Sequence, residues 1–234
     1  MVSSSDFELY QVDLVICLDV TASMGSVLES TKRSALELGD RLERVANAAG
    51  KSVADIRVKV VPFRDLEHEG SEAIWTSPWF ELPRQSSDFS VFVNGLRAKG
   101  GGSEPESGLE AFWFAMNSSW REQGLKRRSI IVMLTDASAH PLGAVPYEVE
   151  QQAFPTPRDL HELELRWGTV GDEEESVFGP RNFSGRRLVL LTPDTYPWTK
   201  VADFQRTVWV PTLAGAGLSE MEWDEICKRI VASV

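Results

Sequence analysis

Apolar and polar positions follow two periods along the chain, and together they predict strands that alternate with helices. Continuous apolar runs at residues 14–18 and 129–134 are typical of strands buried on both faces of a sheet. Apolar residues recur at three- and four-residue spacing over residues 27–49, which predicts a helix that stops at Gly50. The same patterns predict helices at 89–96, 106–120 and 159–167, and strands at 56–63, 73–82, 188–191 and 207–213.

The polar segment 64–70 is too short to connect two parallel strands, which need a crossover. Strands 56–63 and 73–82 are therefore expected to form an antiparallel hairpin. Pro78 lacks a backbone donor and suits an edge position. The other strands alternate with helices, so the prediction is an α/β fold with a mostly parallel sheet, one antiparallel edge strand and helices on both faces.

Local residue choices mark several helix ends. Asp88 is expected to cap one helix, Ser103 or Glu104 the next, and Gly168 to stop a third. A capping box at residues 219–222 predicts a closing helix that runs to about residue 232. The segment 137–185 is irregular, and its acidic part, 171–185, is expected to be a surface loop. We expect one domain over residues 1–234, with its core from about residue 12.

Composition indicates which classes of partner and which cellular compartment to expect. The 234 residues carry a formal charge of −11, which argues against nucleic acid and anionic membrane as main partners. Cys17 and Cys227 both fall in apolar patterns and are expected to be core thiols. The first residues lack the features of a secretory signal, and no stretch approaches the length of a membrane span. The expected location is therefore cytoplasmic.

Oxygen-bearing side chains follow two of the apolar runs. Asp19, Thr21 and Ser23 come directly after the first run, and Asp136 follows the run at 129–134. Ser103 follows a glycine-rich turn before the helix at 106–120. Small oxygen ligands on tight loops suit a hard cation such as Mg²⁺. The first loop on its own is equally well explained by an ordinary Asp/Thr/Ser helix cap.

These three segments together resemble a von Willebrand factor type A domain with a metal-ion-dependent adhesion site. That family has a D-x-S/T-x-S loop, a Thr or Ser after a glycine-rich turn, and an Asp that ends a later apolar strand. The matching residues here are Asp19, Thr21, Ser23, Ser103 and Asp136. The resemblance covers residues 12–234 and implies a three-layer Rossmann-like fold. It is greatest for the stand-alone cytosolic bacterial members.

The resemblance implies a module without enzymatic activity that binds Mg²⁺ or Mn²⁺ and uses the ion to hold a Glu or Asp of a protein partner. Such members are often encoded within bacterial signalling, stress or phage-defence systems. His140 and Trp198 are expected on the partner-binding rim, Trp198 as an exposed anchor. The loops 137–147 and 192–199 are expected to form this surface, while segment 62–69 is a weaker candidate.

Two other functions remain open from the sequence. A strand-end aspartate with Mg²⁺ also occurs in haloacid-dehalogenase-like phosphatases, but their second aspartate is replaced here by Thr21, and there is no obvious catalytic lysine. No P-loop motif is present. The second alternative is an interaction domain whose metal site is vestigial and empty.

Overall fold

The computed structural model describes residues 9–26, 28–102, 104–123, 126–143, 156–169, 177, 183–212, 227–228 and 231. Its centre is a six-stranded sheet with strand order β3-β2-β1-β4-β5-β6. The strands are β1 Leu9–Asp19, β2 Ser52–Phe63, β3 Phe80–Leu82, β4 Lys126–Leu134, β5 Arg186–Pro193 and β6 Thr207–Thr212. The strands pair in parallel except β3, which runs antiparallel to β2 at the edge.

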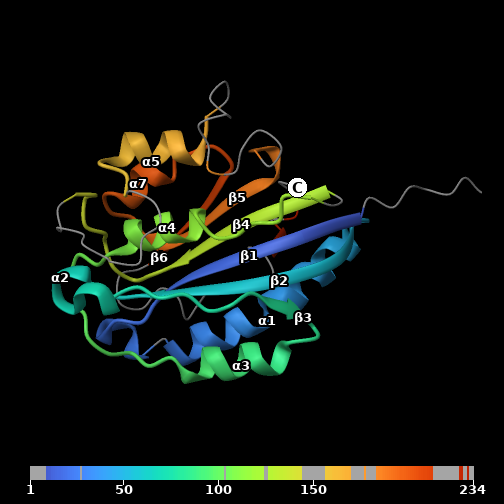
Figure 1. Cartoon of the computed structure of the whole chain (residues 1–234), viewed down its shortest axis with the longest axis horizontal. Coiled ribbons are helices and arrows are strands. Elements are labelled where there is room, and N and C mark those ends of the chain that lie inside the picture. Colours follow the sequence, from blue (N-terminus) through green and yellow to red (C-terminus); the bar gives the residue numbers. More distant parts are fainter. Residues whose placement is uncertain are drawn as a thin grey trace, which may run out of the picture.

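Helices cover both faces of this sheet, so the fold has three layers (Figure 1). The helices are α1 Leu28–Ala48, α2 Leu66–Glu69, α3 Ser86–Gly95, α4 Gly108–Met116, α5 Leu160–Trp167 and α7 Trp198–Val201. In Figure 1, α1 and α3 lie on one face, α4, α5 and α7 on the other, and α2 at the end where β1 and β2 finish. Short 3₁₀ turns span Ala22–Ser26, Gly70–Glu72 and Phe183–Gly185.

Strand β1 is buried on both sides, as its continuous apolar sequence predicts. Leu14, Ile16 and Leu18 point into the core formed with α1 and α3. Val15 and Cys17 point into the core formed with α4, α5 and α7. Side chains alternate along a strand, so one apolar run supplies both cores. Because β1 lies between β2 and β4, the loop that follows it is in the middle of the carboxyl end of the sheet.

The α/β fold with one antiparallel edge strand is confirmed, and the remaining differences concern connections. The expected strand 73–82 is reduced to β3 and an isolated bridge between Phe63 and Ile74. The segment after β2 forms α2 instead of a plain hairpin connection. Helix α4 spans Gly108–Met116 instead of 106–120, and its N-cap is Ser107, so the expected cap at Ser103 or Glu104 is wrong. Asp88 was expected to cap α3 but lies in its first turn, and the N-cap is Gln85.

The two ends of α5 agree with the sequence. Asp159 caps α5 by accepting a hydrogen bond from the Glu162 backbone, and Gly168 is the C-cap. Cys17 and Cys227 are both buried, as expected of core thiols. The closing capping box at 219–222, most of the acidic segment 171–185 and Ser103 lie outside the described residues. Among the described helices, none is long and apolar enough to cross a lipid bilayer.

Candidate metal centre

Two neighbouring parallel strands bring Asp19 and Asp136 to the same edge of the sheet. Strand β1 ends at Asp19, and its partner β4 ends at Leu134, which pairs with Leu18. The backbone and hydroxyl of Thr21 donate to Asp19 Oδ1 at 2.9 and 2.6 Å. The Thr135 hydroxyl donates to Asp19 Oδ2 at 2.6 Å. The loop after β1 and the end of β4 are thus joined through one carboxylate.

The chain of hydrogen bonds continues from Thr21 to Asp136. The Thr21 and Ser23 hydroxyl oxygens are 3.0 Å apart, and Ser23 Oγ donates to Asp136 Oδ1 at 3.2 Å. Four of the five predicted ligands therefore form one connected group. Ser103 lies outside the described residues, but the turn before it is near, because Ala22 N donates to the Gly100 carbonyl at 3.0 Å. Metal binding by this group remains a prediction.

Both carboxylates of this group are buried. Burial raises the pKa of Asp19 to about 6, although hydrogen bonds from Thr135 and Thr21 oppose the shift. Burial also raises the pKa of Asp136. In the described part of the chain, neither forms an ion pair with a Lys, Arg or His side chain. A buried anion without a cation is unfavourable, so the site fits a ligand that carries positive charge.

Glu106 lies beside this group and was not recognised from the sequence as a site residue. Its backbone joins the segment after β4, because Glu106 N donates to Ser138 O and His140 N donates to Glu106 O. A Cβ on Gly101 would lie 2.8 Å from Glu106 Oε1 and 2.9 Å from Thr21 Cβ. Burial, followed by the nearby charge of Asp19, raises the pKa of Glu106 to about 8. Nothing in the sequence indicated this position, because its apolar pattern placed Glu106 in the predicted helix 106–120.

The two residues expected on the binding rim are both buried. Trp198 is 0% exposed, and its Nε1 donates to the Ala137 carbonyl at 3.0 Å. The expectation of an exposed anchor at Trp198 is wrong, because α7 packs the indole inward against Gly108. His140 is 9% exposed, and its Nε2 lies 3.3 Å from Asp65 Oδ1. It therefore faces Asp65 at the start of α2.

Comparisons with known proteins support the fold and leave the family open. No protein-family profile matches the chain. A putative ariadne-like RING finger protein of Acanthamoeba polyphaga mimivirus is 28% identical over 129 residues, which are 55% of this chain and 11% of that protein. The chain therefore spans about a tenth of the length of this relative.

Two solved structures share the fold at low sequence identity. Proximal thread matrix protein 1 from the mussel byssus superposes with a TM-score of 0.55 and 13% identity, covering 95% of this chain and 48% of that one. The open conformation of the pilus adhesin SpaC from Lactobacillus rhamnosus GG has a TM-score of 0.50 and 11% identity, with 94% and 30% covered. At these identities the likeness concerns the fold alone.

Proposed function

We propose that this protein is a metal-dependent interaction module that binds Mg²⁺ or Mn²⁺ through Asp19, Thr21, Ser23, Ser103 and Asp136. A Glu or Asp of a protein partner would complete the coordination of the ion. The observation that carries this proposal is the hydrogen-bonded chain from Asp19 through Thr21 and Ser23 to Asp136. It gathers two carboxylates and two hydroxyls from two different strand ends.

The chemistry of these groups fits a hard divalent cation. All of the donors are oxygens, which Mg²⁺ and Mn²⁺ prefer. Within the described residues, Asp136 Oδ2 is buried and has no hydrogen-bond partner. The hydroxyls are neutral, so the two aspartates would balance the charge of one divalent ion. A bound cation would offset both buried carboxylates and accept a further carboxylate from outside.

The proposed role requires no reaction on a substrate, so we propose no enzymatic activity. Together with the resemblance of the sequence to stand-alone bacterial modules, the arrangement favours a cytoplasmic component of a bacterial signalling, stress or defence system. The likeness to an adhesin and to a byssus matrix protein is compatible with a binding role, but it rests on the fold.

Calorimetric titration of the chelator-stripped protein with Mg²⁺ and Mn²⁺ tests the metal site. We expect one site, and we expect Asp19→Asn to abolish it, because the amide removes charge while keeping the shape of the side chain. Asp194→Asn is the matched control, since Asp194 is an exposed carboxylate after β5. Unchanged affinity in Asp19→Asn, with normal circular dichroism, would overturn the assignment. Hydrolysis of a generic phosphate ester with Mg²⁺ would instead favour the phosphatase alternative.

A further inference from the structure

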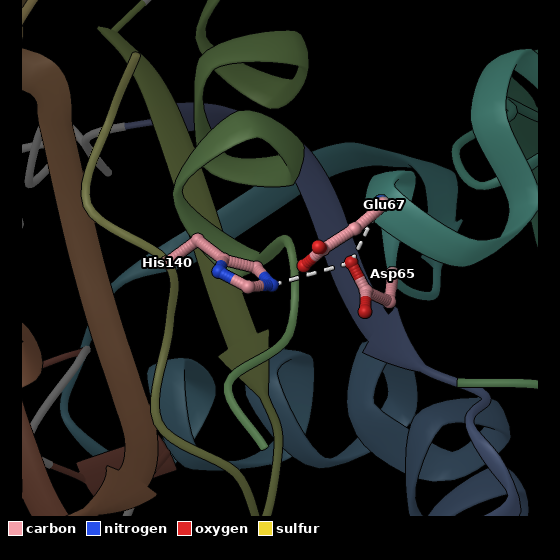
Figure 2. Close-up of side chains that lie close together, drawn as sticks. All are labelled: Asp65, Glu67 and His140. Atoms are coloured by element: carbon pink, nitrogen blue, oxygen red, sulfur yellow. Dashed lines mark hydrogen bonds and ion pairs between the residues drawn. The ribbon is translucent and has the colours of Figure 1, made fainter. Parts of the chain in front are cut away.

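A second group of metal-binding side chains lies between α2 and the segment after β4. Figure 2 shows Asp65, Glu67 and His140 directed toward one another from these two segments. Their candidate ligand atoms all lie within 4.8 Å of one another. Strands β2 and β4 flank β1 and run parallel to it, so the residues that follow them emerge at the same end of the sheet. None of these three residues belongs to the Asp19–Asp136 group.

The Asp65 carboxylate is fully buried and held in one orientation. Its Oδ1 accepts the Glu67 backbone N–H at 2.9 Å, which caps α2. Its Oδ2 lies 2.6 Å from His68 Nδ1. Each carboxylate oxygen has two lone pairs, so one on each oxygen remains available to a further ligand. The cap and His68 therefore orient Asp65 without using up its capacity as a ligand.

His140 supplies an independent reason to place a cation here. The residue is 9% exposed, yet Nε2 makes no hydrogen bond within the described part of the chain. This nitrogen lies 3.3 Å from Asp65 Oδ1. Zinc–ligand bonds of roughly 2.0–2.2 Å place two ligands of a tetrahedral site about 3.4 Å apart. The separation of these two buried atoms matches two ligands of one zinc ion.

We propose that Asp65, Glu67 and His140 bind a divalent transition cation of the zinc type, separately from the Asp19–Asp136 site. An imidazole nitrogen beside two carboxylates suits Zn²⁺, whereas Mg²⁺ and Ca²⁺ prefer oxygen alone. Glu67 is exposed, so its side chain can rotate to bring its carboxylate, now within 4.8 Å of the other two ligand atoms, onto the ion. Three protein ligands leave a fourth position for water or a partner. This site does not depend on the proposed Mg²⁺ site.

Zinc titration of the full chelator-stripped chain in excess Mg²⁺ tests this proposal. We expect one Zn²⁺ per chain, and we expect Glu67→Gln and His140→Gln each to weaken it by about tenfold or more, since loss of even an outer-shell partner has such an effect. Glu67 is exposed, so its substitution leaves folding unaffected even where His140→Gln does not fold. His161→Ala is the matched control, because His161 is an exposed histidine on α5.

Two further readouts separate this site from its alternatives. Asp19→Asn should keep Zn²⁺ binding, and nitrogen NMR of the histidine rings should show Zn²⁺ on His140. Zinc binding that is lost in Asp19→Asn but kept in Glu67→Gln would assign the ion to the first site and overturn the proposal. Loss of Zn²⁺ binding in His161→Ala would show that the ion binds adventitiously at the surface, which would also overturn the proposal. A stripped protein that binds no Zn²⁺ would reduce the Asp65–His140 contact to an ordinary ion pair.

Discussion

Buried carboxylates dominate the chemistry of single residues at the carboxyl end of the sheet. Burial raises the pKa of Asp19 to about 6, of Glu110 to about 7 and of Glu106 to about 8. Each group keeps its proton in the folded protein at a pH where the unfolded chain has lost it. Ionisation therefore favours the unfolded chain, and stability falls as pH rises through this window.

We predict that the free energy of unfolding of the metal-free protein decreases from about pH 5 to about pH 8. Glu106→Gln should reduce this decrease and stabilise the protein at the upper end by about 1 kcal/mol or more, because one pKa unit corresponds to about 1.4 kcal/mol. Urea denaturation in chelator at several pH values measures this effect. The control is Glu72→Gln, an exposed carboxylate whose removal should leave the profile unchanged. A wild-type profile in Glu106→Gln would contradict the prediction.

Trp198 is a second residue whose role the structure changes. Its buried indole packs against Gly108 and hydrogen-bonds to Ala137, the neighbour of Asp136. We predict that Trp198→Ala destabilises the protein by about 3–5 kcal/mol, as expected when a large buried side chain leaves a cavity. Tyr196→Ala is the matched control, because Tyr196 is 57% exposed and should change stability by less than about 0.5 kcal/mol. If Trp198→Ala and the wild-type protein had equal unfolding midpoints in denaturant, Trp198 would not be a core residue.

Some site residues could be predicted from the sequence and others could not, depending on whether a recognisable strand directly precedes them. Asp19 and Asp136 are found because each directly follows a long apolar strand, so strand and ligand are visible together. Glu106 was predicted to be the first residue of a helix, and its position beside the site follows from tertiary contacts such as its bridge to Ala139. Asp65 and His140 belong to different loops, and tertiary contact alone brings them together.

At the scale of elements, long periodic segments were predictable and short connections were not. Helix α1 agrees with its apolar pattern to within one residue at each end, whereas β1 and β4 begin five and three residues before their apolar runs. The four-residue helix α2 has no periodic pattern of its own. Its structure depends on its Asp65 cap and on Ser107, whose hydroxyl accepts the Leu66 N–H at 2.9 Å. Such an element depends on contacts that are distant in sequence.

The glycine turn connects α2 to the proposed magnesium site. Gly101 N donates to Glu69 Oε1 at 2.8 Å, and a Cβ at this position would press against Glu106 and Thr21. We predict that Gly101→Ala lowers Mg²⁺ affinity about tenfold or more, which is about 1.4 kcal/mol or more, because the new methyl group displaces Thr21. Calorimetry of the stripped variant measures this change.

Gly50 provides a matched control for the backbone effect. Gly50 and Gly101 both have φ of +74°, but a Cβ on Gly50 would meet nothing within 4 Å. Both substitutions carry the strain of an L residue in this conformation, on the order of 1–2 kcal/mol. Only Gly101→Ala should alter metal affinity. Equal affinities in the two variants would show that the turn does not position Thr21.

At the scale of the whole molecule, the fold was predictable because its layers follow from the order of the elements. Strands that alternate with helices form a mostly parallel sheet covered on both faces. The antiparallel neighbour of β2 was correctly predicted, although β3 is only three residues long and the connection over residues 64–79 is longer than expected. This topology puts the ends of β1, β2 and β4 together, and with them both proposed metal sites. The choice of ion depends on side chains and was not predictable from the topology.

Net charge determines how an acidic partner side chain would approach this surface. The chain carries a formal charge of −11, and the carboxylates Asp19, Asp65 and Asp136 all lie at this end of the sheet. Without a bound cation, this surface repels a Glu or Asp of a partner. With a divalent ion in the Asp19–Asp136 site, the same side chain finds a strong local positive charge.

We therefore predict that capture of the native partner on the immobilised protein fails in chelator and returns with Mg²⁺ or Mn²⁺. Asp136→Asn should abolish capture in the presence of Mg²⁺, because it removes half of the charge that holds the ion. Asp194→Asn removes an exposed charge at the end of β5 and should change affinity by about 1 kcal/mol or less. One acidic residue of the partner should be indispensable, and its truncation should weaken binding by about 2 kcal/mol or more. A complex that survives both chelation and Asp136→Asn with unaltered affinity would place the binding surface on another face, with the metal site vestigial.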